Sequence, residues 1–139
     1  MLLHIIARGK IGRSPEAELV ERYLKRISWP TKLTELSERA PLPASQSATI
    51  TVLLDERGKA LSSSELAAKL EQWRDRGTRE VRFMIGAADG HSDMERSSAD
   101  LLLSFGPATW PHLLVRAMLR EQWLRATSIL ANHPYHREG

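Results

Sequence analysis

The feature that most constrains this fold is a regular alternation of short apolar segments with segments of helical pattern. Residues 2–7, 49–54, 80–85 and 101–105 are short apolar-rich runs, and a turn that contains glycine follows each of them. Runs of this length are typical of strands buried on both faces, and a weaker alternation predicts a further strand at 32–36. Because helical segments separate these strands, the sequence predicts an α/β fold with a mostly parallel sheet flanked by helices.

Two of the helical segments begin at residues that can cap a helix. Ser14 precedes a proline and a glutamate, a combination that satisfies free N–H groups and suits the positive end of the helix dipole. Ser62 and Glu65 have the spacing of a capping box, and Gly77 is expected to end that helix.

A third helical segment, residues 111–130, is apolar over a wide arc rather than along one narrow stripe. A helix of this kind must be buried on more than one side. In so small a protein, this pattern suggests an interface with another subunit. Trp123 of this segment and Trp73 of the preceding helix are expected in the core or in an interface, rather than as platforms for stacked bases.

Composition indicates an ordinary soluble protein with one domain, residues 1–139. Hydrophobic residues make up 42% and charged residues 27%, and the chain contains no cysteine, which excludes disulfides and thiolate metal sites. No apolar run approaches the length that spans a bilayer, and the first residues are too short and poorly flanked for a signal peptide. We therefore expect no membrane association and a cytoplasmic location.

Positive charge alone does not establish a partner. The formal net charge is +3, which is compatible with RNA binding, but many basic proteins bind no nucleic acid. Arg116, Arg120 and Arg125 of the third helix could contact phosphates, or they could form a solvated helix edge. Both interpretations stay open at this point.

Three loops lie where an open α/β sheet binds its ligands, beyond the carboxyl ends of strands. These are residues 54–58, 85–90 and 105–110, and each contains glycine, which lets the backbone approach a ligand closely. Their backbone amides could hold an adenine and a ribose. Turns of this kind are also common without any ligand, and none of the three matches a phosphate loop or a dinucleotide fingerprint.

The five histidines do not predict a metal site. His133 and His136 are three residues apart, but a proline lies between them and no acidic cluster accompanies them. We expect His4 to be structural, His91 to be solvated, and His112 to cap or pack a helix start.

The C-terminal segment, residues 132–139, has an unusual composition for a chain end. It combines two histidines, a tyrosine, an arginine and an asparagine, whereas termini are usually compositionally dull. Donors, a ring and a cation together suit the recognition of a nucleotide. The alternatives are a loose end, or a segment that docks the chain on its neighbour.

Several segments, in the same order along the chain, resemble the large-subunit ribosomal RNA methyltransferase H family (RlmH) of the SPOUT class. Residues 132–138, Asn-His-Pro-Tyr-His-Arg-Glu, reproduce the closing motif of that family. Residues 111–116 resemble its Pro-His-x-Leu-Val-Arg helix start, and residues 66–73 resemble its middle helix. Residues 54–55 and 85–86 resemble the end of its third strand and the start of its glycine loop.

The resemblance implies a trefoil-knotted α/β fold, a homodimer, and S-adenosyl-L-methionine bound in the knot loops. It implies methyl transfer to N3 of a pseudouridine in 23S rRNA on the assembled ribosome. Carried over by position, the cofactor-binding residues would be Leu54, Gly86, Phe105, Gly106, Pro107, Ala108, Thr109 and Trp110. Candidates for the removal of the N3 proton or for contact with the substrate are the tail residues His133, Tyr135, His136 and Arg137.

Two departures from the family pattern keep a second interpretation open. The family loop Gly-Gly-Pro-Glu-Gly is replaced by residues 86–90, Gly-Ala-Ala-Asp-Gly, which keep only the acidic position, at Asp89, between the end glycines. The chain is also shorter near residues 41–47, where other members have a basic loop and a helix. The alternative is a non-catalytic RNA-binding or ribosome-associated dimer, which should not bind S-adenosylmethionine. A knotted methyltransferase with another RNA target is a third possibility that the tail motif disfavours.

Overall fold

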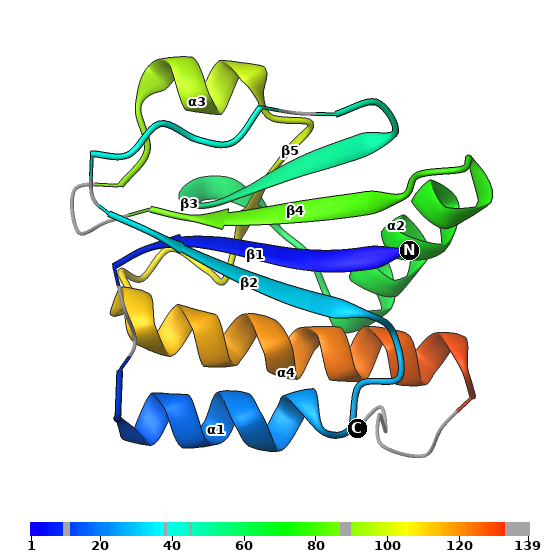
Figure 1. Ribbon diagram of the computed structural model, residues 1–139. Coiled ribbons are helices and arrows are strands. Elements are labelled where there is room, and N and C mark those ends of the chain that lie inside the picture. Colours follow the sequence, from blue (N-terminus) through cyan, green and yellow to red (C-terminus); the bar gives the residue numbers. More distant parts are fainter. Residues whose placement is uncertain (10–11, 38, 45, 87–89, 133–139) are drawn as a thin grey trace.

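The computed structural model describes residues 1–9, 12–37, 39–44, 46–86 and 90–132 (Figure 1). Its centre is a five-stranded sheet in the order β2-β1-β4-β3-β5, and every neighbouring pair is parallel. The strands are β1 (Leu2–Arg8), β2 (Thr31–Leu36), β3 (Thr49–Ala60), β4 (Glu80–Ile85) and β5 (Leu101–Ser104). The predicted parallel α/β sheet is confirmed.

Helices cover the two faces of the sheet unequally. The helices are α1 (Pro15–Leu24), α2 (Ser63–Asp75), α3 (Asp93–Ser98) and α4 (His112–Leu130). Helices α1, α2 and α4 lie on one face, and the short α3 lies on the other, above the sheet in Figure 1. Because the strands run in one direction, their carboxyl ends meet at the left-hand edge of the sheet in that view.

The helix starts follow the capping rules read from the sequence. The Ser14 hydroxyl accepts a hydrogen bond from the Ala17 N–H at 3.1 Å, and Ser62 forms the predicted capping box. Helix α3 was not predicted, although Ser92 and Glu95 form a second capping box of the same type. With only six residues and no buried one, α3 has no apolar period by which to recognise it.

The main core fills the space between the sheet and the three larger helices. Phe83 of β4 and Trp123 of α4 meet edge to face, with 5.3 Å between ring centroids. Trp73 of α2 belongs to the same core, so both tryptophans pack as predicted. A smaller cluster of Ile6, Leu53 and Met84 lies on the face of α3.

The wide apolar arc of α4 is covered by other elements of the same chain. Helix α4 packs against α1 on one side, α2 on the other, and β4 of the sheet. A helix between two neighbours and a sheet needs apolar residues on several sides. The arc therefore no longer argues for a subunit interface, and the homodimer stays a prediction.

The expectations for the arginines of α4 were wrong for two of the three. Arg116 and Arg120 are almost fully buried. Neither residue therefore belongs to a solvated helix edge or to a surface that could contact phosphates. The Arg116 guanidinium donates to Glu35 at 2.6 Å from Nη1. Only Arg125 lies at a partly exposed edge, where it pairs with Glu121 one turn earlier.

Replacing Arg120 with methionine should stabilise the protein. Burial and the neighbouring charge of Arg116 lower the pKa of Arg120 to about 10, and its Nε and Nη1 find no hydrogen-bond partner among the described residues. Exchanging a buried cation with two unsatisfied donor nitrogens for an apolar chain of similar length should raise the free energy of unfolding by about 1–2 kcal/mol. Urea unfolding of Arg120→Met measures this, with Arg125→Met as the control that should show no gain.

The third strand extends past its predicted end at residue 54. Leu54 and Lys59 both pair with Leu103 of β5, and residues between them form an irregularity in the ladder. The backbone of Gly58 therefore lies directly against β5. Sequence patterns do not show this continuation, because residues 55–60 are polar or small and their pairing depends on a strand more than 40 residues away.

Candidate functional site

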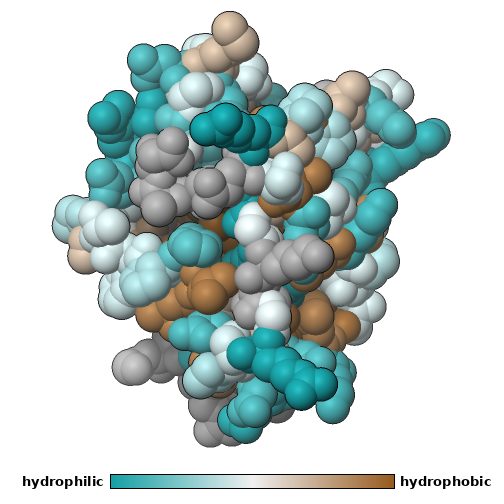
Figure 2. All heavy atoms as spheres, turned by 60° about the vertical axis from the view of Figure 1, so that its left-hand side comes forward, coloured by the Kyte–Doolittle hydropathy of each residue, from teal (hydrophilic) through white to brown (hydrophobic). Residues whose placement is uncertain are grey.

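A cavity of about 320 Å³ lies where the irregular part of β3 and the carboxyl ends of β4 and β5 meet the start of α4. This is the edge of the sheet at which α/β folds bind their ligands. Figure 2 turns this side forward and shows apolar surface, in brown, between hydrophilic side chains. The position predicted for a ligand site is therefore hollow.

Residues that the resemblance assigned to the cofactor come together around this cavity. Seven of the eight line it, namely Leu54, Gly86, Phe105, Gly106, Ala108, Thr109 and Trp110. Pro107 lies in the same loop without lining the cavity. Three segments that are separate in the sequence thus surround one cavity. Cofactor binding by these residues stays a prediction.

The loop after β5 is held in shape by its own hydrogen bonds. Gly106 has a φ of +107°, a conformation that favours glycine. The Ser104 hydroxyl donates to the Gly106 carbonyl at 2.7 Å and accepts from its N–H at 3.0 Å. The Trp110 indole N–H donates to the Phe105 carbonyl at 3.3 Å. These contacts fold the loop back on itself beside the cavity.

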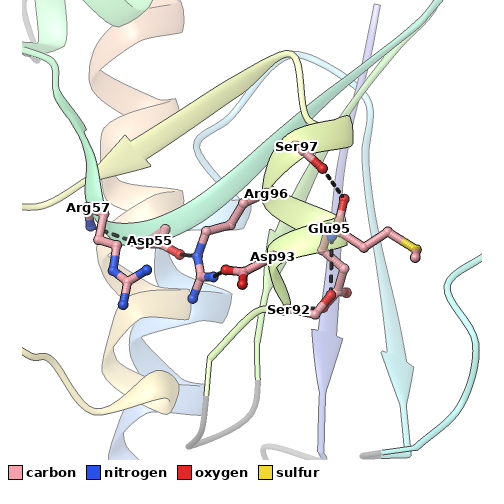
Figure 3. Close-up of polar contacts among 8 residues, drawn as sticks. Asp55, Arg57, Ser92, Asp93, Glu95, Arg96 and Ser97 are labelled. Carbon is pink, nitrogen blue, oxygen red and sulfur yellow. Dashed lines mark hydrogen bonds and ion pairs between the residues drawn. The ribbon is translucent and has the colours of Figure 1, made fainter.

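A polar wall that the sequence did not assign lies opposite this loop. Asp55 is at its centre: its Oδ1 accepts from the Arg57 N–H and its Oδ2 from Arg96 Nε, each at 2.8 Å (Figure 3). Burial alone would raise the pKa of the Asp55 carboxyl, but these hydrogen bonds and the Arg96 charge hold it below its usual value. The Thr109 hydroxyl donates to Glu56 at 2.9 Å and so joins this wall to the loop after β5.

The signals for this wall were partly present in the sequence. Asp55, Glu56 and Arg57 follow a strand, in one of the three loops named as ligand loops. Arg96 was missed because α3 was missed. Its approach to Asp55 joins residues 41 positions apart, which no local pattern encodes.

His91 also lines the cavity, and the expectation that it is solvated was wrong. Only 8% of its surface is exposed, because it lies behind the carboxyl ends of β3 and β4. Burial lowers the pKa of the imidazole, and the charges of Glu95 and Asp55 and the carbonyls of Met84 and Leu54 oppose this only in part. The ring is therefore neutral at pH 7.

Stability should depend on pH through His91. Its pKa in the folded protein is below the ordinary value of 6.5, so the unfolded chain binds more protons in the window between the two values. The free energy of unfolding should therefore fall as the pH drops through the range below 6.5, and His91→Gln should reduce this fall. Thermal unfolding at a series of pH values measures the slope.

Some predicted site residues lie outside the described part of the chain. These are Asp89 of the glycine loop and the tail residues His133, Tyr135, His136 and Arg137. His4 is structural as expected, since its ring nitrogens contact Glu80 and Thr34 across neighbouring strands. Among the residues that the structure describes, no three histidine or acidic side chains form a group that could hold a metal ion. Within the same residues, no helix is both long and apolar enough to cross a bilayer.

A comparison with known protein families identifies the family of this chain. A family model described as "Predicted SPOUT methyltransferase" matches residues 1–136, nearly the whole chain. The chain belongs to this family. The chain is therefore a methyltransferase, and it has the α/β fold with a parallel sheet expected from the sequence.

Relatives place the chain within one branch of the SPOUT methyltransferases. It is 69% identical over 140 residues to the ribosomal RNA large subunit methyltransferase H of Erythrobacter litoralis, with all of both chains covered. The same protein of Novosphingobium aromaticivorans is 67% identical, again over the full length of both. The branch proposed from the sequence motifs is therefore confirmed.

A solved structure supports the fold. A probable methylase family protein from Haemophilus influenzae superposes with a TM-score of 0.63 over 98% of this chain and 70% of its own. Its sequence identity is 11%, so this likeness concerns the fold alone.

Proposed function

We propose that this methyltransferase transfers a methyl group from S-adenosylmethionine to N3 of a pseudouridine in 23S rRNA on the assembled ribosome. The observation that carries the proposal is the cavity beside β3, β4 and β5, lined by seven of the eight residues that the resemblance assigns to the cofactor. The full-length relatives are named for a large-subunit ribosomal RNA reaction. Such a reaction belongs in the cytoplasm, where ribosomes are assembled and work.

The cavity has the chemistry that S-adenosylmethionine needs. Its volume of about 320 Å³ falls within the usual range of small-molecule sites. Leu54, Ile85, Leu103 and Val115 provide apolar surface for an adenine ring, and the loops provide backbone groups for its edge. The sulfonium and the ammonium group of the cofactor are positively charged, and the Glu56 carboxylate in the polar wall suits such charges.

The protein's own contribution is positioning and proton removal. The cofactor supplies an electrophilic methyl group, so the main task of the loops is to hold it in line with the acceptor. The N3 proton of the pseudouridine must also leave. We assign this task to the tail residues His133, Tyr135 and His136, and anion or phosphate contact to Arg137. We also propose that the protein is a homodimer.

Calorimetric titration with S-adenosylmethionine tests the cofactor assignment. We expect saturable binding to the wild-type protein, weakened at least about tenfold by Gly106→Val, because a β-branched residue cannot adopt the φ of this loop without strain. Gly77→Val is the matched control. Gly77 also has a positive φ, of +87°, but lies away from the cavity, so its replacement should leave affinity unchanged.

Methylation of ribosomes that lack the modification tests the reaction itself. The wild-type protein should transfer the labelled methyl group to the large-subunit rRNA, and His136→Ala should bind the cofactor normally but transfer more slowly. Normal turnover by His136→Ala would remove this residue from the mechanism.

The second candidate is a non-catalytic RNA-binding or ribosome-associated dimer. It is favoured by one observation, the loss of a glycine and a proline from the glycine loop at residues 87 and 88. The titration separates the two candidates. Absence of saturable binding at millimolar S-adenosylmethionine would favour the non-catalytic protein.

A further inference from the structure

The short helix α3 is attached to the rest of the protein mainly through charged side chains. None of its residues is buried, so apolar packing contributes little to its position. Arg96 pairs with Asp55 in the irregular part of β3, and Glu95 lies 3.9 Å from Arg8 of β1. Figure 3 shows Arg96 reaching from α3 toward Asp55. The placement of α3 therefore depends on ion pairs.

Arg96 has two carboxylate partners that differ in their surroundings. Its Nε donates to Asp55 at 2.8 Å and its Nη1 to Asp93 at 2.6 Å. The Asp55 side chain is only 6% exposed, whereas that of Asp93 is 97% exposed. Water and salt screen the exposed pair, so the contact with Asp55 is the one that can hold Arg96 in place.

This contact joins two walls of the cavity. Asp55 belongs to the irregular part of β3 that follows Leu54, and Arg96 belongs to α3, yet both line the same hollow. The second oxygen of Asp55 accepts the Arg57 N–H and so shapes this irregularity. The Asp55 carboxylate therefore fixes the shape of the wall formed by β3 and the distance between that wall and α3.

We propose that the Asp55–Arg96 ion pair is a positioning clamp that sets the width of the methyl-donor cavity. This inference rests on the proposed function, since it concerns how the same cavity holds its cofactor. Arg96 acts through Asp55 rather than by touching the charged end of the cofactor. The clamp therefore governs the binding of any ligand that fills the cavity, including one without an amino-acid moiety.

A double-mutant cycle tests the clamp. Titration with S-adenosylmethionine should show binding about tenfold weaker in Asp55→Asn and in Arg96→Gln. The double variant should be no weaker than either single one, because each change already releases the clamp. Asp93→Asn is the matched control: it removes the other partner of the same guanidinium, and affinity should stay within about twofold of wild type.

A second ligand separates positioning from direct contact. 5′-Methylthioadenosine carries the nucleoside and sulfur but no amino-acid group, so a positioning clamp predicts the same fractional loss for it as for S-adenosylmethionine. Arg96→Lys keeps the positive charge but lacks the planar guanidinium with its several N–H donors. It should bind S-adenosylmethionine with intermediate affinity. Thermal unfolding should show all variants folded, since α3 contributes no buried residue.

The outcomes distinguish this inference from the proposed function. Wild-type binding with unchanged affinity in Asp55→Asn and Arg96→Gln would overturn the clamp and leave the methyltransferase assignment standing. Additive losses in the double variant, or a loss seen with S-adenosylmethionine alone, would also overturn it. Absence of cofactor binding by the wild-type protein would overturn the proposed function and the clamp together.

Discussion

Replacing Glu35 with glutamine should lower the free energy of unfolding by about 3 kcal/mol. Arg116 is fully buried, and its Nη1 donates to the Glu35 carboxylate at 2.6 Å. Its Nη2 donates to the Gly9 carbonyl at 2.7 Å, which does not neutralise the charge. Arg120 lies close to the same carboxylate, whose charge opposes the lowering of the Arg120 pKa. A neutral residue at position 35 therefore leaves two buried cations without this compensating carboxylate.

Urea unfolding measures this loss, and two further variants define its cause. Glu121→Gln, at the partly exposed pair with Arg125, should cost no more than about 1 kcal/mol. In an Arg120→Met background, the loss from Glu35→Gln should be smaller, because one of the two cations is already gone. Equal losses for Glu35→Gln and Glu121→Gln would show that buried charge does not govern the stability of this region.

Replacing Gly58 with alanine should destabilise the protein by about 3 kcal/mol, although it adds one methyl group. A Cβ at this position would lie 2.6 Å from the carbonyl carbon of Leu102 and 2.7 Å from the nitrogen of Leu103. Both atoms belong to the backbone of β5, which cannot move aside without breaking its pairing with β3. The strain should spread along β3 to Asp55 and reduce cofactor binding as well.

Gly77→Ala is the appropriate comparison for Gly58→Ala. Gly77 has a φ of +87° but no atom within 4 Å of an added Cβ, so only backbone strain opposes the change. We expect a loss of about 1 kcal/mol there. Thermal or urea unfolding of both variants measures the difference. A Gly58→Ala protein as stable as Gly77→Ala would mean that β5 can shift away from β3.

Much of the fold was predictable because its signals are local. Buried parallel strands are rich in apolar residues, as residues 49–54 and 80–85 are, and helix starts carry capping residues such as Ser14 and Ser62. The predicted ends of the strands then indicate which loops lie together at one edge of the sheet. Most of the apolar side of the candidate site followed from this reasoning together with the family motifs.

The polar side of the site was not predictable in the same way. Asp55 and Arg96 are ordinary surface residue types in the sequence, and only the meeting of β3 with α3 makes them partners. His91 has the composition of a loop residue, and it is buried because two strand ends close around it. No period or spacing encodes such burial.

The sequence alone was enough to derive the order of the strands and of the three larger helices, the parallel sheet, the edge at which ligand loops meet, and membership of the SPOUT methyltransferases. These depend on apolar periodicity, capping and motif order, which are properties of neighbouring residues. The tertiary structure alone decided that Arg116 and Arg120 are buried, that Gly58 must be glycine, and that Asp55 and Arg96 join two walls of the cavity. Each of these depends on which distant segment packs against a residue, and chain folding sets that neighbour.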